Sequence, residues 1–332
     1  MIRWELVSDN TGVEIWDKSL VEFPDYNIYQ TYAWGQHKGN FGWIPQRFMA
    51  YDPENNVVAM FQVLLRRYPG NILMLWGSGG PVGGIENWDD SLQQAFIHEF
   101  KSNRVYCRIF PQRAYQSQDA LALRAYAWTR CMQTLNSGIS MMLELDDESQ
   151  FIAGMTKNWR HNLNRSKKLD LSISHWENPD IDDIIQVYES MQDYKGLEVQ
   201  YSKNELVSLL QAFNKRIVIY RCMGSQGEIL GFRACAVIGD KAWDFLAATN
   251  VEGRKTYASY ALFVELIKHC RSLGVKYYDF SGIDPLTNKG VYDFKKGTGA
   301  KPIEYLGEWD WSTSEWLKWG INWAIRKKGG RL

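Results

Sequence analysis

The chain has 332 residues, and its 38 Lys and Arg balance 38 Asp and Glu, so its formal net charge is zero. That balance excludes a globally basic nucleic-acid-binding protein but leaves room for a local basic patch. Hydrophobic residues make up 45% of the chain and charged residues 23%, which is an ordinary globular composition. At about 150 residues per domain, the length predicts two domains.

Cysteine, histidine and hydropathy narrow the class of protein further. The five cysteines are widely spaced without a C-x-x-C pair, which indicates buried thiols in a reducing cytoplasm. The five histidines lack metal-ligand spacing, so no metal site is expected. No apolar run approaches the ~18 residues of a membrane span, and the first residues do not resemble a signal peptide. We therefore expect a cytoplasmic protein.

The first half of the chain predicts strands separated by turns, followed by one helix and a further strand. Apolar stretches bounded by turn residues indicate strands at 46–52, 57–65 and 72–76, and a glycine-rich stretch follows at 77–84. Apolar residues spaced by four predict a helix over 89–102, which leads into a strand at 104–110.

The second half repeats this order. Strands are predicted at 216–222, 229–238 and 241–248, then a helix over 259–273 and a strand at 275–281. The repeat predicts an α+β protein with two tandem N-acyltransferase-like (GNAT-like) domains, each a mixed, mostly antiparallel sheet with flanking helices. In that fold an acyl donor lies in a wedge between two splayed strands. We place the first domain at 1–150 and a helical connector, the second domain and a C-terminal helix at 151–332.

A basic stretch lies between the two predicted domains. On a helix, Lys157, His161, Arg165 and Lys168 fall on one side, with Arg160 nearby and no acid between Glu148 and Asp170. This stripe fits phosphate groups of a nucleotide, a lipid diphosphate or a tRNA. A solvated helix face explains it equally well.

Two segments of the second half bear on acyl transfer. Coenzyme A enzymes of this fold hold the pyrophosphate with small residues at a helix start, but here Tyr257 and Ser259 occupy those places. Further on, Phe294 and Lys295 precede a Gly-x-Gly turn, so we expect Lys295 on a loop beside an apolar wall. An ammonium group there could stabilise an oxyanion.

Together these features resemble the FemXAB family of aminoacyl-tRNA-dependent peptidyltransferases, in its compact type without a coiled-coil arm. The resemblance extends over nearly the whole chain. The matching pieces are Thr31-Tyr32-Ala33-Trp34-Gly35-Gln36-His37-Lys38, Gly79-Gly80-Pro81-Val82, the stretch 160–168, Thr256-Tyr257-Ala258-Ser259-Tyr260-Ala261, Tyr278-Asp279-Phe280-Ser281-Gly282-Ile283, the segment 291–299 and Glu304-Tyr305-Leu306-Gly307-Glu308.

The resemblance implies an aminoacyltransferase that moves an amino acid from a charged tRNA to the amine of a peptidoglycan precursor or a similar peptide or amine. It implies aminoacyl-tRNA as co-substrate without a further cofactor, a UDP-linked or lipid-linked acceptor, and a monomer. Lys295 and Phe294 match the catalytic motif, and either Tyr257 or Tyr260 matches a functional tyrosine.

On the acceptor side, assigned to the first domain, Lys38 and Trp34 match the W-x-x-x-K motif. Arg108 matches the arginine of Arg-x-Asp-Pro, but Phe110 replaces the acid of that motif. The basic residues Lys157, Arg160, Arg165 and Lys168 are the candidates for tRNA phosphates.

Two alternative functions remain from the sequence: an acyl-coenzyme A N-acyltransferase of the same fold, and a non-catalytic protein that binds a glycan or peptide precursor. The predicted C-terminal helix, 313–327, also has two interpretations. Its residues Trp316, Trp319 and Trp323 recur at i, i+3 and i+7, with Arg326 and Lys327 after them. This pattern suits a helix at a membrane surface, as well as a helix that caps the second domain with its tryptophans buried.

Overall fold

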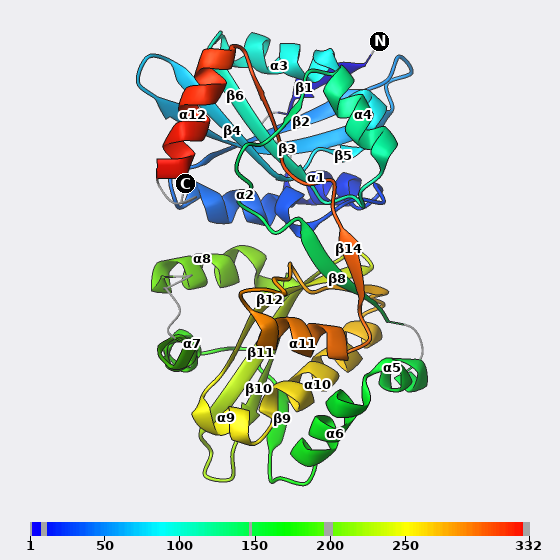
Figure 1. Cartoon of the computed structure of the whole chain (residues 1–332), viewed down its shortest axis with the longest axis vertical. Coiled ribbons are helices and arrows are strands. Elements are labelled where there is room, and N and C mark those ends of the chain that lie inside the picture. Colours follow the sequence, from blue (N-terminus) through cyan, green and yellow to red (C-terminus); the bar gives the residue numbers. More distant parts are fainter. Residues whose placement is uncertain (1, 8–11, 146–147, 196–201, 328–332) are drawn as a thin grey trace. The chain divides into compact units, whose positions relative to one another are not determined.

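The computed structural model describes residues 2–7, 12–145, 148–195 and 202–327. The chain divides into two compact units: unit 1 comprises Met1–Gly138 and Glu304–Leu332, and unit 2 comprises Ile139–Ile303. In Figure 1 each unit is a mixed β-sheet with helices packed on its faces. The expected α+β class is confirmed.

Unit 1 is built on an eight-stranded sheet in the order β1-β2-β3-β4-β6-β15-β7, with β5 paired to β3. Its strands are β1 (Arg3–Leu6), β2 (Ile44–Tyr51), β3 (Val57–Tyr68), β4 (Ile72–Gly79), β5 (Val82–Gly83), β6 (Val105–Pro111), β7 (Thr129–Arg130) and β15 (Trp309–Ser312). Its helices are α1 (Val13–Leu20), α2 (Tyr32–Gly39), α3 (Asp90–Phe100), α4 (Ser117–Ala125) and α12 (Glu315–Lys327), with short 3-10 turns at Ile28–Gln30 and Ile85–Asn87.

Unit 2 is built on a seven-stranded sheet in the order β14-β8-β13-β12-β11-β10-β9. Its strands are β8 (Ile139–Glu144), β9 (Ser172–His175), β10 (Ile217–Met223), β11 (Ile229–Ile238), β12 (Lys241–Thr249), β13 (Tyr277–Asp279) and β14 (Lys301–Glu304). Its helices are α5 (Glu148–Gly154), α6 (Lys157–Ser166), α7 (Ile181–Lys195), α8 (Lys203–Phe213), α9 (Val251–Lys255), α10 (Ala258–Ser272) and α11 (Lys289–Gly297), with a 3-10 turn at Asn214–Arg216.

The predicted internal repeat is present in the strand pairing. In unit 1, β2, β3 and β4 pair antiparallel in succession, and β6 joins β4 in parallel after helix α3. In unit 2, β10, β11 and β12 pair in the same way, and β13 joins β12 in parallel after helix α10. The same topology twice in one chain supports a duplicated domain.

The observed boundaries differ from the predicted division at residue 150. Strand β8 precedes that boundary but pairs with β13 of unit 2, whereas β15 follows it by 159 positions and pairs with β6 of unit 1. Each sheet is therefore completed by a strand that lies outside its own repeat. The segment predicted as a connector forms helices of unit 2, together with the edge strand β9.

Large aromatic side chains fill the core of each unit. In unit 1 the fully buried residues include Trp88, Trp128 and Trp309. In unit 2 the core cluster includes Trp159, Phe263 and Tyr278. These buried rings account for part of the 14% of residues that are aromatic.

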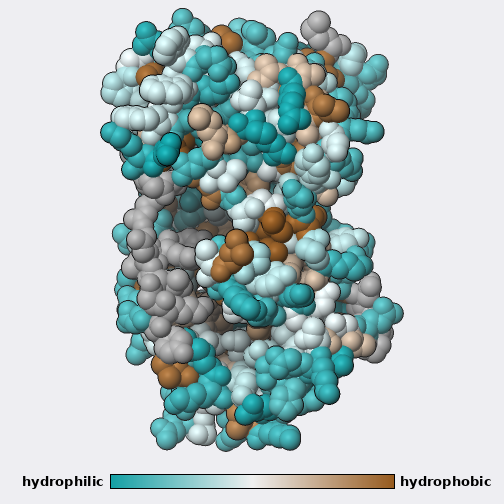
Figure 2. Space-filling view, in the orientation of Figure 1, coloured by the Kyte–Doolittle hydropathy of each residue, from teal (hydrophilic) through white to brown (hydrophobic). Residues whose placement is uncertain are grey.

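The surface is mainly polar. Figure 2 shows hydrophilic residues over most of the visible face, with hydrophobic residues in small groups. Among the helices that the structure describes, the longest have 15 residues, and none combines the length and the apolar character that crossing a membrane requires.

Candidate active site

The two units differ at their parallel strand pair. In unit 1, β4 and β6 remain paired over seven positions, from Leu73–Val105 to Gly79–Pro111. In unit 2, β12 and β13 pair over only three, from Lys241–Tyr277 to Trp243–Asp279. Beyond Trp243 the β12 edge is no longer bonded to β13, which corresponds to the wedge expected of the acyltransferase fold.

A cavity of about 530 Å³ lies at this divergence in unit 2. Its walls come from α7, β11, the part of β12 beyond its pairing with β13, α9, the start of α10 and helix α11. The charged residues that line it are Arg233, Asp244, Arg254 and Lys295. Three cations against one carboxylate favour an anionic ligand.

Lys295 is the buried cation of this cavity. Only 8% of the residue is exposed, and its Nζ donates hydrogen bonds to the carbonyl oxygens of Phe280 at 2.7 Å and Gly282 at 2.6 Å. Burial lowers the pKa of Lys295, and the nearby Asp244 carboxylate partly opposes that shift. Since an ammonium group has three N–H bonds, one remains to meet a ligand in the cavity.

The position of Lys295 differs from the loop expected from the sequence. The segment Lys289–Gly297 is helix α11, and Lys295 lies in its last turn. A cation is favourable there because the helix dipole is negative at that end. The glycines that suggested a loop serve close packing instead: a Cβ on Gly297 would lie 2.6 Å from Cδ1 of Trp159.

A left-handed turn after β13 presents the two carbonyls to Lys295. Ser281 and Gly282 have φ angles of 56° and 93°. The Asp279 carboxylate accepts a hydrogen bond from the Ser281 backbone N–H at 2.7 Å, and Ser140 Oγ accepts one from the Gly282 N–H at 2.9 Å. These bonds hold the turn in the conformation that fixes the ammonium group.

An aromatic wall stands beside Lys295. The Phe294 ring lies 5.3 Å from that of Tyr260 and 5.6 Å from that of Trp159, measured between centroids. The Trp159 indole N–H donates to the Phe294 carbonyl at 3.1 Å, which joins α6 to α11. The Tyr260 hydroxyl accepts from Asn162 Nδ2 at 3.0 Å, so its own hydrogen is available to a ligand.

An ion pair in the cavity wall escaped the sequence analysis. Arg233 Nη2 and Asp244 Oδ2 lie 2.6 Å apart, and the Tyr278 hydroxyl donates to Asp244 Oδ1 at 2.7 Å. The Arg233 guanidinium also faces the Phe294 ring at 5.1 Å. The available signal was a single arginine within the otherwise apolar strand β11.

Tyr257 forms the entry to helix α10. It adopts a left-handed conformation, with φ 58° and ψ 27°, and its side chain makes no capping bond to the first turn. Both Tyr257 and Ser259 line the cavity, so the N–H groups at the start of α10 lie at its edge. The Arg165 guanidinium lies 4.5 Å from the centre of the Tyr257 ring.

The other basic residues of 157–168 have different environments, and α6 ends at Ser166, before Lys168. Lys157 and Lys168 are exposed. Arg160 donates from Nη1 to the carbonyls of Ala153 and Met155, both at 2.8 Å, and so holds the end of α5. Of the four predicted phosphate contacts, Arg165 alone stacks on a cavity residue in the part of the chain that the structure describes.

Lys38 and Trp34 lie together on α2 of unit 1. The Lys38 Nζ is 4.9 Å from the centre of the Trp34 ring, and both side chains are partly exposed. The Trp34 ring also packs edge-on against Tyr29 at 4.9 Å. The two residues of the predicted motif are therefore in contact, with the Lys38 cation over the Trp34 ring.

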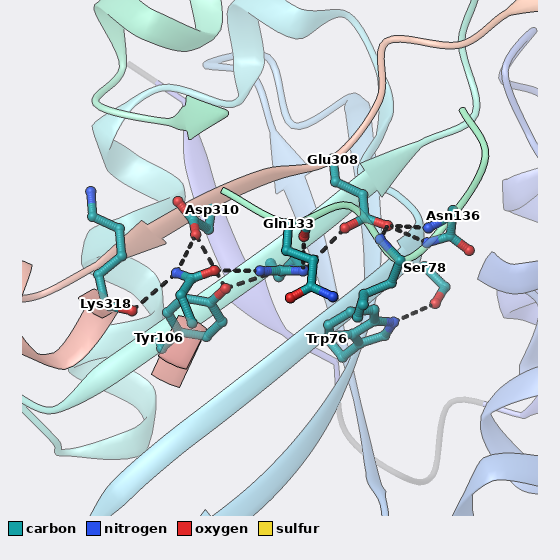
Figure 3. A network of polar contacts seen from close by, with 11 residues as sticks. Trp76, Ser78, Tyr106, Gln133, Asn136, Glu308, Asp310 and Lys318 are labelled. Carbon is teal, nitrogen blue, oxygen red and sulfur yellow. Dashed lines mark hydrogen bonds and ion pairs between the residues drawn. The ribbon is translucent and has the colours of Figure 1, made fainter. Parts of the chain in front are cut away.

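Arg108 has an internal role that differs from the predicted contact with an acceptor. It is 1% exposed, and three of its hydrogen-bond partners, Tyr106, Gln133 and Glu308, are labelled in the polar network of Figure 3. Its guanidinium donates to the groups Tyr106 Oη, Gln133 O, Glu308 Oε2 and Asn322 Oδ1, at 2.9, 3.0, 3.1 and 2.7 Å. These bonds use four of its five N–H groups, and the acceptors come from β6, the loop at Gln133, the residue before β15 and α12.

Comparisons with known proteins agree with this geometry. Residues 236–325 match the model of the FemAB family. The chain is 22% identical, over 92% of its length and 94% of the relative, to a UDP-N-acetylmuramoylpentapeptide-lysine N(6)-alanyltransferase of Weissella viridescens.

Solved structures share the fold. A crystal structure of FemX superposes with a TM-score of 0.82 at 15% identity, covering 96% of this chain and all of the other. A tandem GNAT protein from the clavulanic acid biosynthesis pathway gives 0.55 at 12% identity, covering 95% and 99%. The two units are therefore tandem GNAT-like domains, as the sequence repeat predicted.

Proposed function

From these likenesses we propose that the chain is a member of the FemXAB family and an aminoacyltransferase that moves an amino acid from a charged tRNA to the amine of a peptidoglycan precursor. The observation that carries this proposal is the buried Lys295 ammonium group at the diverging strands of unit 2. It faces a cavity with an aromatic wall on one side and the start of a helix on the other.

In this proposal the acceptor amine attacks the carbonyl carbon of the aminoacyl ester. A C–N bond forms, and the bond from the carbonyl carbon to the 3′-terminal oxygen of the tRNA breaks. The acceptor nitrogen loses a proton and the leaving oxygen gains one, so the reaction is balanced without an oxidant or a metal. An aminoacyl ester is already activated, and positioning of the two substrates supplies much of the rate.

Lys295 stabilises the oxyanion of the tetrahedral intermediate through its third N–H bond. Because Phe280 and Gly282 already hold the other two, the ammonium group does not have to reorganise as charge develops. Phe294 excludes water beside it. Asp293, a carboxylate two residues before Lys295, is exposed and pairs with Lys289 at 2.6 Å. The Tyr260 hydroxyl is better placed to contact the substrates, because Tyr260 lines the cavity.

The co-substrate of the proposed reaction is aminoacyl-tRNA, and the proposal requires no further cofactor. Arg165, Arg254 and the first N–H groups of α10 supply positive charge for the phosphates of the tRNA 3′ end. Lys157, at the start of α6, and Lys168, two residues after its end, extend that charge. On unit 1, Lys38 over the Trp34 ring provides a cation and a flat apolar surface for the acceptor, a UDP-linked or lipid-linked precursor. A cytoplasmic monomer accords with these substrates.

The test is to incubate the protein with a mixed pool of charged tRNAs and a panel of peptidoglycan precursors, and to identify products by mass. Replacing Lys295 with Met keeps the apolar stem and removes the ammonium group. We expect this change to lower turnover by a factor on the order of 10²–10³, the usual effect of losing an oxyanion partner.

Lys296→Met is the matched control, because Lys296 is the next residue on the same helix and is exposed. It is expected to retain turnover within about twofold. Near-normal turnover of folded Lys295→Met would contradict the proposed role. Adding acetyl-coenzyme A in place of the charged tRNA separates the coenzyme A alternative, for which transfer would persist without tRNA. Binding of the precursor without consumption of either donor would instead indicate a non-catalytic binding protein.

A further inference from the structure

Helix α12 carries a row of exposed tryptophans. Trp316, Trp319 and Trp323 are 85%, 61% and 50% exposed, and they follow one another at i, i+3 and i+7. This spacing places the three rings on one side of the helix. The sequence left open whether these rings were buried. In the structure all three are exposed.

The opposite side of α12 is fixed to unit 1. Ile325 and Asn322 are 2% and 6% exposed, and Ile325 packs in a cluster with Met74 and Tyr106. Asn322 accepts from Arg108 and donates to Asp310 Oδ2 at 2.9 Å. Because these contacts hold the helix, the tryptophans cannot turn inward without breaking a buried polar network.

The exposed side of α12 is positively charged. Arg326 and Lys327 are exposed, and the Lys327 Nζ lies 4.1 Å from the centre of the Trp323 ring. The one acid of the helix, Glu315, is neutralised by Lys318 at 2.7 Å. The surface therefore combines amphipathic rings with two exposed cations.

We propose that this face of α12 docks on an anionic lipid surface. Indole rings favour the headgroup layer, where their apolar body is buried and their N–H stays hydrated. The two cations at the same end meet the negative potential of anionic lipid. A helix with both features lies in the plane of the interface, and unit 1 stays outside it. This inference is independent of the proposed transferase activity.

The test is co-sedimentation of the full chain with vesicles. Wild-type protein is expected to sediment with phosphatidylcholine vesicles containing about a third phosphatidylglycerol, and less with pure phosphatidylcholine or in high salt. The combined change Trp316→Ala, Trp319→Ala and Trp323→Ala is expected to lower the bound fraction at least about tenfold. Arg326→Gln with Lys327→Gln is expected to remove the preference for anionic lipid.

The matched control is Leu121→Ala, Leu273→Ala and Leu286→Ala, which removes three exposed apolar side chains elsewhere at 63%, 51% and 90% exposure. It is expected to bind vesicles as the wild type does. The proposal is overturned if the wild type stays in the supernatant, or if the triple tryptophan variant sediments equally. A wild-type dimer that the tryptophan variant lacks would also overturn it, because the face would then cover a second copy of the chain.

Discussion

Burial of Lys295 is unfavourable for the stability of unit 2, although the buried ammonium group has a proposed role in the reaction. A lysine at 8% exposure loses hydration, and the two backbone carbonyls only partly replace it. Such a cation persists in a core when the surrounding structure fixes it, and here the left-handed turn at Ser281 and Gly282 does so. The sequence motif identified the residue, but not its helix or the carbonyls that hold it, since those depend on a turn 13–15 positions earlier.

The lowered pKa of Lys295 makes stability depend on pH. An unfolded lysine has a pKa near 10.5, and burial places the folded value below it. Between the two values the unfolded chain binds more protons, so the free energy of unfolding rises with pH in that window. The Lys295→Met variant lacks this contribution. We therefore expect the free energy of unfolding of the wild type to increase, relative to that of the variant, as the pH rises towards 10.5.

Urea unfolding of both proteins from neutral pH to about pH 10 measures this difference. Parallel stability curves would contradict a lowered pKa. The same shift predicts that turnover declines on the alkaline side earlier than an ordinary lysine would allow, because the oxyanion partner loses its charge.

At the scale of elements, polar contacts join segments that are distant in the sequence. Arg108 of β6 contacts Glu308, just before β15, and Asn322 of α12, across 200 and 214 positions. Glu308 Oε1 in turn accepts from the backbone N–H groups of Leu135 and Asn136 at 2.9 and 2.8 Å. Apolar stretches, turn residues and the four-residue spacing of apolar side chains predicted the local hairpins and helices, but such long-range pairings leave no periodic signal.

Replacing Arg108 with Met should therefore destabilise unit 1 rather than weaken acceptor binding. The change leaves the Glu308 carboxylate buried without its cation, which costs about 3–5 kcal/mol in comparable pairs. Urea unfolding measures the loss. The control is Arg104→Met, at an exposed position directly before β6. It is expected to change the free energy of unfolding by no more than about 0.5 kcal/mol.

Steady-state kinetics at a temperature where both variants are folded completes this test. The KM for the acceptor should remain unchanged in Arg108→Met. Wild-type stability together with a raised acceptor KM would restore the role that the sequence motif suggested for Arg108.

At the scale of the whole molecule, one topology occurs twice and has diverged. In unit 1 the parallel strands β4 and β6 pair over seven positions, which closes the wedge between them. In unit 2 the parallel strands β12 and β13 pair over only three, which leaves the wedge open. The repeat was predictable because each copy is continuous in sequence. The difference was not, because it depends on where two parallel strands separate, and the Arg233–Asp244 pair in the opening comes from neighbouring strands whose side chains meet only after folding.

A chain that ends after Ile303 tests how unit 1 is completed. It lacks Leu306 and Trp309, both fully buried in the unit 1 core, and Trp311 at 8% exposure. Losing these residues removes several large apolar side chains at about 3–5 kcal/mol each, as much as the stability of a typical domain. We expect limited proteolysis to degrade residues before 139 and to spare 139–303.

A shorter deletion, from Ser314 onward, retains β15 and is the control. It should lower the resistance of unit 1 to proteolysis less than the deletion after Ile303 does, because it removes α12 but keeps the paired strand β15. Equal resistance of unit 1 in both truncated chains and the full chain would contradict the assignment of β15 to its core.

The split arrangement of unit 1 also sets an order of assembly during translation. Unit 2 is continuous and ends at Ile303, so all of its residues are synthesised before Trp309. Until β15 (Trp309–Ser312) is synthesised, the sheet of unit 1 is incomplete and one edge of β6 is unpaired. Domains usually fold in the order of their synthesis. Here the later-encoded domain can finish first, and the nascent first domain is the one that would need protection by chaperones.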